Sequence, residues 1–245
     1  MITEKKIAFI GGINGGIGSA LTNILYNQGW AVLGFSRSGD SVEGAEKVWS
    51  ADASKAEAFE NLAATLLDEY GAPTAYFHCI GSIFLKPAHL TKPEEFDGIL
   101  QKNLYSAFHA LRLLADPIGK NGGGSLTFVS TVAARTGLPN HETIAAAKAG
   151  LEGLVRGAAS TYAPRKVRVN AVAPGLVETP AAKGIIGSEM AKKASAAMYP
   201  LNRIGQPEEV ASLMAWLAGA DAEWVTGQIW NIDGGMGHLR PKPKV

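Results

Sequence analysis

The sequence predicts an α/β fold, in which a doubly wound parallel sheet of about seven strands carries helices on both faces. Short apolar runs rich in Val, Ile and Phe recur along the chain, and longer segments with helical periodicity separate most of them. A glycine-rich turn joins the first apolar run directly to the first helical segment. The alternation indicates parallel β-α-β winding, and the turn indicates a binding site at the edge of the sheet.

The expected strands are short, which is typical of buried strands in a parallel sheet. They are Ile7–Ile10, Ala31–Phe35, Lys47–Trp49, Thr74–Cys79, Leu126–Val129, Val167–Val172 and Gln228–Ile232. The expected helices are Gly16–Gln28, Lys55–Tyr70, Pro93–Asp116, Glu142–Ala163 and Pro207–Ala218. No linker, internal repeat or shift of composition divides residues 1–245, so we expect one Rossmann domain. Residues at about 181–200 interrupt the pattern, and we expect a substrate lid there.

Composition and charge disfavour several classes of partner. The chain carries 23 Lys and Arg against 22 Asp and Glu, so nothing in its charge favours nucleic acid or an anionic membrane. Cys79 is the only cysteine, which excludes an intramolecular disulfide and a thiolate metal cluster and suits a reducing cytoplasm. No apolar stretch reaches about 18 residues, and the N-terminus shows no targeting pattern. We expect a cytoplasmic protein that binds no metal.

The turn after the first strand suits a pyrophosphate. It reads Gly11-Gly-Ile-Asn-Gly-Gly-Ile-Gly18, and the first helix begins near its end. Glycine permits unusual dihedrals and lets an anion approach the free N–H groups of the helix N-terminus. A P-loop is excluded, because Ile17 and Gly18 stand where Lys and Ser or Thr are required. The residues expected to bind a dinucleotide are Gly12, Asn14, Gly15, Gly16, Ile17 and Gly18. A purely structural turn is the alternative.

The end of the second strand indicates which dinucleotide binds. In an NAD site, an acidic residue about 20 positions after the glycines binds the adenosine ribose. Here the strand ends in Phe35-Ser36-Arg37-Ser38, without a carboxylate, and Arg37 suits a 2′-phosphate through two parallel hydrogen bonds. We therefore expect Ser36 and Arg37 to favour NADP(H) over NAD(H). The alternative is a solvated surface Arg37, with the ribose bound by Asp40.

A further set of residues spans nearly the whole chain. It consists of Asp52 after the third strand, Asn103, Lys148, Ala173-Pro-Gly175 with Thr179, and Ile232-Asp-Gly-Gly235. Together with the glycine turn, this set resembles the short-chain dehydrogenase/reductase family. The resemblance implies a homotetramer packed on its long helices, and the small residues of Ala145–Ala159 permit such packing.

The resemblance also implies roles for residues around the cofactor. Asp52 and Ala53 would hold the adenine, Gly81 would lie beside the nicotinamide ribose, and Thr179 would contact the carboxamide. The remaining residues expected to line the cofactor are Lys148, Pro174, Gly175 and Val177. The family usually has Asn-Asn-Ala-Gly where this chain has His78-Cys-Ile-Gly81, so only Gly81 and the backbone roles transfer there.

The catalytic centre departs from the family pattern. Ordinary members reduce carbonyls with a Ser, a Tyr and a Lys four residues after the Tyr, supported by an Asn. Aligned on Lys148, this chain has Thr131 in the Ser position and Ile144 in the Tyr position, and Asn103 matches the supporting Asn. Ile144 cannot transfer a proton, so we expect it to line the substrate pocket, while Asn103, Thr131 and Lys148 are the expected catalytic residues.

Each of these three catalytic candidates has a plainer alternative. Asn103 would be a residue of a helix bulge, Thr131 a cap at a strand end, and Lys148 a surface lysine. The alignment favours the functional interpretation for Asn103 and Lys148 and leaves Thr131 evenly balanced.

His141 is a candidate for the missing acid. Positions 141, 144 and 148 fall on one face of a helix. Enoyl reductases of fatty-acid synthesis, a divergent branch of the family, carry their Tyr seven residues before the Lys, and His141 has that spacing. Histidine is a capable general acid near neutral pH, although a nearby helix N-terminus favours its neutral form. The alternative is an exposed residue at the start of a helix.

Two functions compete on these observations. The first is an NADP(H)-dependent oxidoreductase that transfers a hydride to or from a small substrate with an activated C=C, C=N or C=O bond, protonated by His141, water or Thr131. The second is a catalytically inactive NADP(H)-binding protein with a regulatory or structural role, because a fold alone does not confer activity. In both cases we expect a homo-oligomer, either a tetramer or a dimer.

Overall fold

The computed structural model describes residues 5–240, and one parallel sheet forms its centre. The strands are β1 (Ile7–Gly11), β2 (Ala31–Ser36), β3 (Lys47–Ser50), β4 (Ala75–His78), β5 (Gly124–Val129), β6 (Val167–Pro174) and β7 (Ile229–Ile232). They pair in the order β3-β2-β1-β4-β5-β6-β7, and every pair is parallel. The predicted α/β fold is confirmed. The prediction about targeting falls partly on residues 1–4, outside the described range.

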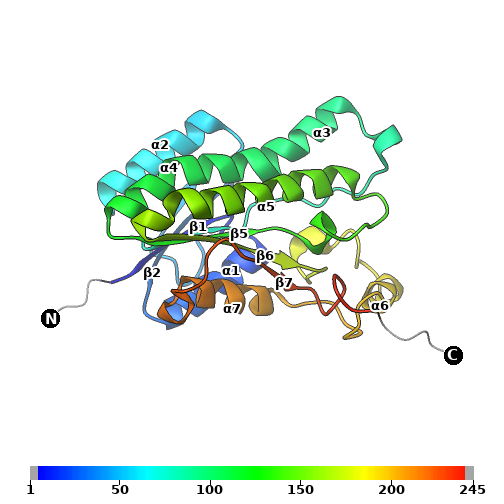
Figure 1. Cartoon of the computed structure of the whole chain (residues 1–245). Coiled ribbons are helices and arrows are strands. Elements are labelled where there is room, and N and C mark those ends of the chain that lie inside the picture. Colours follow the sequence, from blue (N-terminus) through cyan, green and yellow to red (C-terminus); the bar gives the residue numbers. More distant parts are fainter. Residues whose placement is uncertain (1–4, 241–245) are drawn as a thin grey trace.

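Helices cover both faces of this sheet (Figure 1). The helices α2 (Ala56–Glu69), α4 (Ser106–Lys120) and α5 (Glu142–Tyr162) lie on one face, and α3 (Pro93–Leu100) leads into α4. The opposite face carries α1 (Gly16–Asn27) and α7 (Pro207–Ala218). The short helix α6 (Glu189–Ala196) follows the C-terminal end of β6, within the segment predicted to be a lid.

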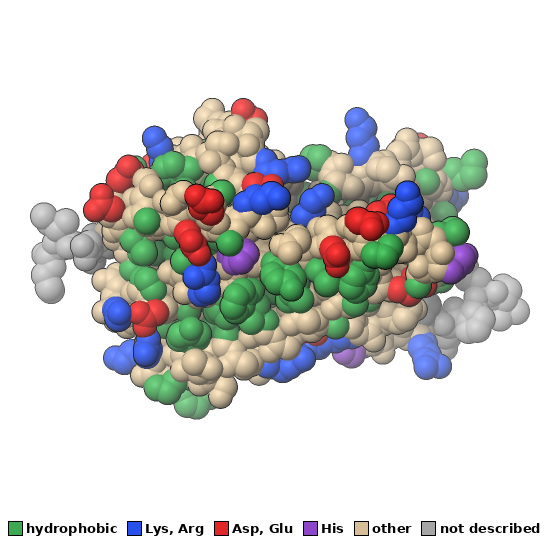
Figure 2. All heavy atoms as spheres, turned by 90° about the horizontal axis from the view of Figure 1, so that it is seen from above, with side chains coloured by type: hydrophobic (Ala, Val, Ile, Leu, Met, Phe, Trp, Pro, Cys, Tyr) green, Lys and Arg blue, Asp and Glu red, His purple; other side chains and the backbone are tan. Residues whose placement is uncertain are grey.

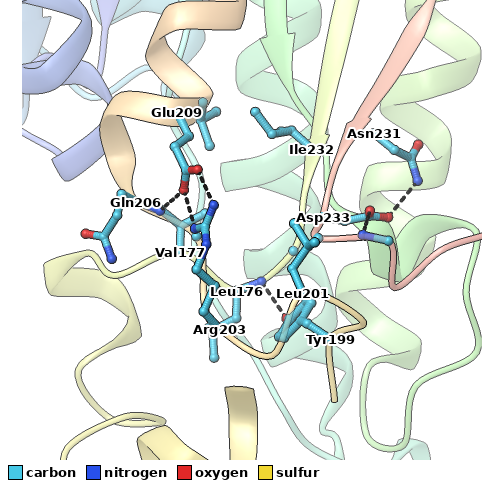
Figure 3. Close-up of a pocket in the computed structure, with 15 residues that line it drawn as sticks. Leu176, Val177, Tyr199, Leu201, Arg203, Gln206, Glu209, Asn231, Ile232 and Asp233 are labelled. Atoms are coloured by element: carbon cyan, nitrogen blue, oxygen red, sulfur yellow. Dashed lines mark hydrogen bonds and ion pairs between the residues drawn. The ribbon is translucent and has the colours of Figure 1, made fainter. Parts of the chain in front are cut away.

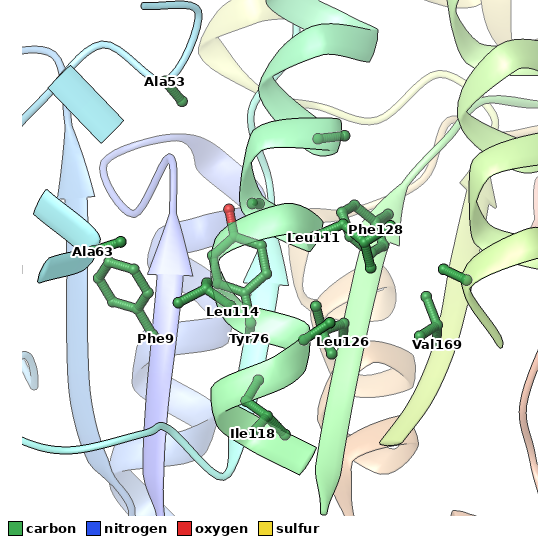
Figure 4. Close-up of a cluster of buried hydrophobic side chains, with 14 of the residues drawn as sticks. Phe9, Ala53, Ala63, Tyr76, Leu111, Leu114, Ile118, Leu126, Phe128 and Val169 are labelled. Atoms are coloured by element: carbon green, nitrogen blue, oxygen red, sulfur yellow. The ribbon is translucent and has the colours of Figure 1, made fainter. Parts of the chain in front are cut away.

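Two apolar layers hold the helices to the sheet. Successive side chains of a strand point to opposite faces, so Phe9 joins the layer under α2, α4 and α5, while Ala8 and Ile10 join the layer under α1 and α7. In the first layer, Tyr76 and other sheet residues pack against Leu114 and its neighbours on α4 (Figure 4). Burial of this kind is the main stabilising contribution to such a fold.

The strand order places a crevice at the C-terminal ends of β1 and β4. Chain winding reverses between these two strands, because β2 and β3 lie on one side of β1 and the later strands lie on the other. In open α/β sheets, ligands bind at such a switch point. The glycine turn follows β1 and Gly81 follows β4, so both lie at this crevice.

The predicted helix Pro93–Asp116 is interrupted, which is the main difference from the expected elements. A π-helical turn at Gln101–Tyr105 separates α3 from α4, and α4 continues to Lys120. The turn carries the buried Asn103, whose Nδ2 donates to the carbonyl of Ile99 at 3.0 Å. Such bulges are frequent at functional sites, because the extra residue redirects a side chain.

Two features are absent from residues 5–240. None of the helices in this range is long and apolar enough to cross a membrane. In the same range, no group of three or more His, Cys, Asp or Glu side chains is placed to hold a metal ion.

Candidate active site

The glycine turn forms a backbone cradle at the N-terminus of α1. Gly12 has a φ of +79°, which favours glycine, and its N–H donates to the carbonyl of Phe35 at 2.8 Å. The N–H of Gly15 then donates back to the carbonyl of Gly12 at 3.0 Å, and α1 begins at the next residue. The N–H groups of Gly16, Ile17 and Gly18 have no carbonyl partner within the helix. They provide donors for an anion at this end of the helix.

Two glycines of the turn are required by close approach. A Cβ at Gly18 would lie 2.3 Å from the carbonyl oxygen of Gly12, so only glycine lets the helix close against the turn. A Cβ at Gly16 would lie 2.8 Å from Cγ2 of Thr179. Residues predicted to contact the pyrophosphate and the carboxamide are therefore in direct contact with each other.

The loop after β2 is fixed beside this turn. The N–H of Gly39 donates to Oγ of Ser36 at 3.0 Å, and Nδ2 of Asn14 donates to the carbonyl of Asp40 at 3.0 Å. Arg37 is exposed and forms no ion pair with any residue of the described range. Its guanidinium is thus available to a ligand anion.

Asp52 and Ala53 lie at the same end of the site, after β3. Oδ1 of Asp52 accepts hydrogen bonds from the N–H and the hydroxyl of Ser54, at 3.0 and 2.7 Å. Burial acts to raise the pKa of Asp52, but these bonds and the charges of Arg37 and Lys55 lower it overall. Because the side chain of Ala53 is buried in the core, only its backbone is available to an adenine.

Asn103 and Lys148 meet at Gly81, beyond the end of β4. A Cβ at Gly81 would lie 3.0 Å from Oδ1 of Asn103 and 3.3 Å from Nζ of Lys148, so the glycine allows both groups to approach. Asn103 also exchanges two hydrogen bonds with Ser82: Oδ1 accepts from its N–H at 3.2 Å, and Nδ2 donates to its hydroxyl at 3.1 Å. The structure thus brings together three residues that the sequence analysis assigned to the site.

Lys148 is buried, which rules out the alternative of a surface lysine. Its Nζ donates to the carbonyl of Val129, at the end of β5, at 2.7 Å. Burial lowers the pKa of Lys148 from 10.5 to about 8. Burial also raises the pKa of the neighbouring Cys79 thiol to about 12, although Lys148 acts in the opposite direction. Cys79, which is partly buried, is therefore a neutral and unreactive thiol at physiological pH.

His78 belongs to a buried hydrogen-bond chain beneath this site. Its Nδ1 lies 2.7 Å from the hydroxyl of Tyr76, and its Nε2 lies 3.0 Å from Oγ of Ser106. Because the Ser106 hydroxyl donates to the carbonyl of Lys102 at 2.7 Å, Nε2 carries the proton and Nδ1 accepts. Burial, aided by the charge of Lys148, lowers the pKa of His78 to about 3. His78 is therefore packed in the interior and neutral at physiological pH.

Thr131 and Ile144, the other two residues of the predicted catalytic centre, differ in what they offer a substrate. Thr131 is partly exposed, and its Oγ1 accepts from the N–H of Ala133 at 3.3 Å, so it caps the short turn after β5. Its hydroxyl keeps a proton to donate. Ile144 is only 6% exposed and packs with Ile99 and Phe84 in a small apolar cluster. Ile144, which the sequence analysis aligned with the Tyr of the family, is therefore surrounded by hydrocarbon.

His141 lies one residue before α5, and not within the helix. Its φ of −102° and ψ of 6° make it the N-cap, so the helical spacing used to place it on the Ile144 and Lys148 face does not apply. Its Nδ1 lies 2.7 Å from the carbonyl of Pro139. A carbonyl only accepts, so Nδ1 carries the proton and the neutral ring presents Nε2 as an acceptor.

The segment after β6 closes the opposite side. Pro174 ends β6, and Gly175 and the buried Val177 follow it. The N–H of Leu176 donates to the hydroxyl of Tyr199 at 2.7 Å, so the end of the predicted lid is attached to this strand end. A cavity of about 280 Å³ lies there, and the bidentate pair of Arg203 with Glu209 lies on its wall (Figure 3).

These elements define a dinucleotide-binding protein of Rossmann architecture. The cradle that a Cβ would fill, the unpaired Arg37 and the Asn103–Lys148 pair around Gly81 fit the pyrophosphate, the adenosine end and the nicotinamide ribose of a nicotinamide cofactor. Such a cofactor supplies or accepts the hydride when it is bound.

Comparisons with known proteins agree with this class. A family model described as Enoyl-(Acyl carrier protein) reductase matches residues 12–237. The 3-oxoacyl-[acyl-carrier-protein] reductase FabG of Thermotoga maritima is 30% identical over 248 residues, covering 96% of this chain and 99% of that protein. Cyclohexanol dehydrogenase of Acinetobacter sp. is 31% identical and covers 94% of each chain. The chain belongs to the short-chain dehydrogenase/reductase family, whose members are oxidoreductases that use nicotinamide cofactors.

Solved structures show the same fold. Thermoplasma acidophilum aldohexose dehydrogenase superposes with a TM-score of 0.90 at 25% identity, covering 99% of this chain and 98% of that chain. ElxO with NADP bound superposes with a TM-score of 0.88 at 22% identity, covering 95% and 99%.

Several residues that shape the site were not predicted from the sequence. Ser82 holds Asn103, and Phe84 and Ile99 enclose Ile144. Glu152 is a buried carboxylate one turn after Lys148 on α5. The only sequence signal for Glu152 is its place on the helix face that carries Lys148; Ser82 carries none beyond its place next to Gly81.

Proposed function

We propose that the protein is an NADP(H)-dependent oxidoreductase that transfers a hydride to or from a small substrate without a tyrosine proton donor. An activated C=C bond is the preferred acceptor, with C=N and C=O bonds as the wider class. One observation carries the proposal: Asn103 and Lys148 stay together around Gly81, while Ile144 is sealed in an apolar cluster. The residues proposed to hold the cofactor lie together, and Ile144 is proposed to replace the tyrosine that usually protonates an alkoxide.

The chemistry of an activated C=C bond suits this arrangement. Hydride addition to an enone or enoyl group produces an enolate, whose oxygen needs hydrogen-bond donors and whose carbon accepts its proton afterwards. The Thr131 hydroxyl is proposed to donate to that oxygen. The buried ammonium of Lys148 is proposed to hold the nicotinamide ribose and to stabilise developing negative charge. A missing Tyr affects this reaction less than it affects ketone reduction.

His141 is proposed to act as an acceptor when its ring is neutral. Its Nδ1 proton is directed at the carbonyl of Pro139, which leaves Nε2 as the free nitrogen. In the direction of reduction, His141 then donates a proton only as an imidazolium, and water or the Thr131 hydroxyl is the proposed proton source when the ring is neutral. In the direction of oxidation, the same nitrogen serves as a base.

The cofactor is proposed to be NADP(H), with NAD(H) as a weaker ligand. Arg37 is exposed, unpaired within the described range and next to the loop that Asn14 fixes. A guanidinium recognises phosphate through two parallel hydrogen bonds, and no carboxylate stands at the end of β2 to bind the 2′-hydroxyl of NAD. ElxO, which shares the fold, binds NADP.

The segment at about 181–200 is proposed to be a lid over the substrate. Ala182 and Tyr199 are buried at its two ends, whereas α6 between them has no buried residue. The side chains of Met190 and Met198 are exposed, with 82% and 53% of their surface accessible. One ion pair, Lys192 to Glu178 at 2.6 Å, connects α6 to the residue before Thr179.

A homo-oligomer in the cytoplasm is the proposed setting. Figure 2 looks onto the helical face of the molecule, where hydrophobic side chains gather along the middle. Tyr105, the last residue of the π-helical turn, and Phe108 on α4 are each 45% exposed. The outer side of α5 carries small residues such as Gly153 and Gly157, and nothing lies within 4 Å of a Cβ added at either. A flat, partly apolar helical face suits packing against a second copy.

The test combines binding and turnover. NADPH and NADH are titrated by the fluorescence of the reduced nicotinamide, and we expect NADPH to bind at least about tenfold more tightly. Arg37→Gln should remove most of this difference, and Lys47→Gln, an exposed change on β3, is the control. NADPH absorbance is then followed with enones, enoyl thioesters, imines and ketones. Tight binding without oxidation of NADPH by any of them would contradict the enzyme and favour a regulatory or structural protein.

A further inference from the structure

Glu152 is a buried carboxylate that the proposed reaction does not use. It lies on α5, one helical turn after Lys148, and its side chain is only 4% exposed. A carboxylate is rarely buried to this degree unless its oxygens are paired. Its partners come from a different part of the chain, the turn that follows β5.

The two oxygens of Glu152 bind the two ends of one short segment. Oε1 accepts from the hydroxyl of Ser130 at 2.9 Å, and Oε2 accepts from Nε of Arg135 at 2.7 Å. Arg156 approaches Oε2 only to 3.9 Å and is half exposed, so it contributes little. Thr131 lies between Ser130 and Arg135, at the start of the turn that Arg135 ends.

We infer that Glu152 is a positioning residue, which fixes the Thr131 hydroxyl relative to Lys148. Glu152 and Lys148 share one rigid helix, and the bonds of Glu152 hold both ends of the segment that carries Thr131. The backbone of Ser130 is also anchored, since its N–H donates to the carbonyl of Val172 at 2.7 Å. Without the carboxylate, the far end of the segment at Arg135 would lose its only side-chain attachment within the described range.

The first arm of the test does not require activity. Glu152→Gln keeps the size of the side chain but removes the charge that accepts from Arg135. Hydrogen exchange measured by mass spectrometry should become about tenfold faster at residues 131–136, while peptides from β1 and α1 stay unchanged. Arg156→Gln is the matched control, because it leaves both close bonds of Glu152 in place. Unchanged exchange at residues 131–136 in folded Glu152→Gln protein would overturn the inference.

The second arm rests on the proposed function. With the substrate of the panel that gives the highest activity, Glu152→Gln should lower kcat about tenfold. The affinity for NADPH should stay within about twofold of that of the parent protein. In a Thr131→Val background, Glu152→Gln should cause no further loss, because the hydroxyl that it positions is gone. If the double variant instead lowers kcat by the product of the two separate reductions, Glu152 acts independently of Thr131, and the inference is overturned. If none of the substrates in the panel leads the parent protein to oxidise NADPH, the proposed function fails. The hydrogen-exchange experiment then still decides the role of Glu152.

Discussion

The two ends of the proposed site differ in the groups that would contact a ligand: backbone at one end and side chains at the other. The end that would hold the dinucleotide phosphates consists mainly of backbone, with glycines where a Cβ would collide and N–H groups at the start of α1. The end where chemistry would occur consists of side chains: Asn103, Thr131, Ile144 and Lys148. Backbone geometry is fixed by the fold, whereas a side chain is replaced by one substitution. A member of this family is therefore able to keep its cofactor cradle while its reaction changes.

The largest expected effect comes from a substitution in the glycine turn, at the backbone end of the site. Gly18→Ala would place a Cβ 2.3 Å from the carbonyl oxygen of Gly12. We expect it to destabilise the fold by about 3 kcal/mol and to remove measurable NADPH binding, because the helix must move away from the turn. Thermal unfolding and fluorescence titration measure the two effects.

Gly98→Ala in α3 is the control for this change, since nothing lies within 4 Å of the added Cβ. Replacing a helical glycine there should stabilise the protein by up to about 1 kcal/mol. NADPH binding by Gly18→Ala at the affinity of the parent would mean that the turn is not the cofactor cradle.

The next prediction restores the missing group at the side-chain end. Ile144→Tyr should give the protein ketone reductase activity, provided that the ring leaves the apolar cluster and turns toward Lys148. Because Ile144 is packed against Ile99 and Phe84, the larger ring should also lower stability by about 1–3 kcal/mol.

Ile144→Phe is the matched control, with the same bulk and no hydroxyl. It should lose the same stability and gain no activity. If folded Ile144→Tyr protein binds NADPH but reduces no ketone, the pocket has been remodelled beyond this one position.

A third prediction concerns Lys148, which would hold the nicotinamide ribose at the side-chain end. Burial lowers the pKa of Lys148 to about 8. Its side chain is therefore a charged ammonium below that pH and a neutral amine above it. If Lys148 holds the cofactor, NADPH affinity should fall as pH rises through about 8, and Lys148→Met should bind about tenfold more weakly at pH 7 with no such dependence.

The same burial predicts the effect of pH on folding. The folded pKa of Lys148 lies below its ordinary value of 10.5, so the unfolded chain binds more protons between about pH 8 and 10.5. This residue should therefore make the parent protein more stable relative to Lys148→Met as pH rises through that window. Lys120→Met, at an exposed lysine near the end of α4, should change neither profile.

The smallest expected effect concerns the lid. Lys192→Ala removes the ion pair with Glu178, but both side chains are more than one third exposed, and such pairs contribute about 0–1 kcal/mol. We expect KM for the substrate to change about twofold and limited proteolysis within residues 183–198 to become faster. Lys193→Ala, at an exposed residue without an ion pair in the described range, should leave both unchanged.

The parts of the fold that depend on local sequence patterns could be predicted from the sequence. All seven strands and both ends of α7 follow from apolar runs and helical spacing, because these patterns reflect burial on a sheet face or a helix stripe. The turn from Gly12 to Gly18 was also predicted from the sequence, because steric constraints within the turn itself require its glycines.

Other features of the site were only alternatives in the sequence analysis or could not be predicted from it. A helix bulge at Asn103 was the alternative interpretation, because the pattern there is ordinarily helical, and the structure has a π-helical turn at this position. The pairing of Glu152 with Ser130 depends on how α5 packs beside β5. His141 has the spacing of a helical residue, but it is the N-cap of α5, which agrees with the alternative of a residue at the start of a helix.

The most direct test of the central claim follows the hydride itself. The parent protein is incubated with NADPH that carries deuterium at the transferable position of C4, together with an enone or enoyl thioester, and the product is examined by mass spectrometry. The account predicts one deuterium at the carbon that receives the hydride and, in a separate reaction in D₂O with unlabelled NADPH, one solvent deuterium at the neighbouring carbon. NADPH that binds tightly but transfers no deuterium to any enone, enoyl thioester, imine or ketone would contradict the account.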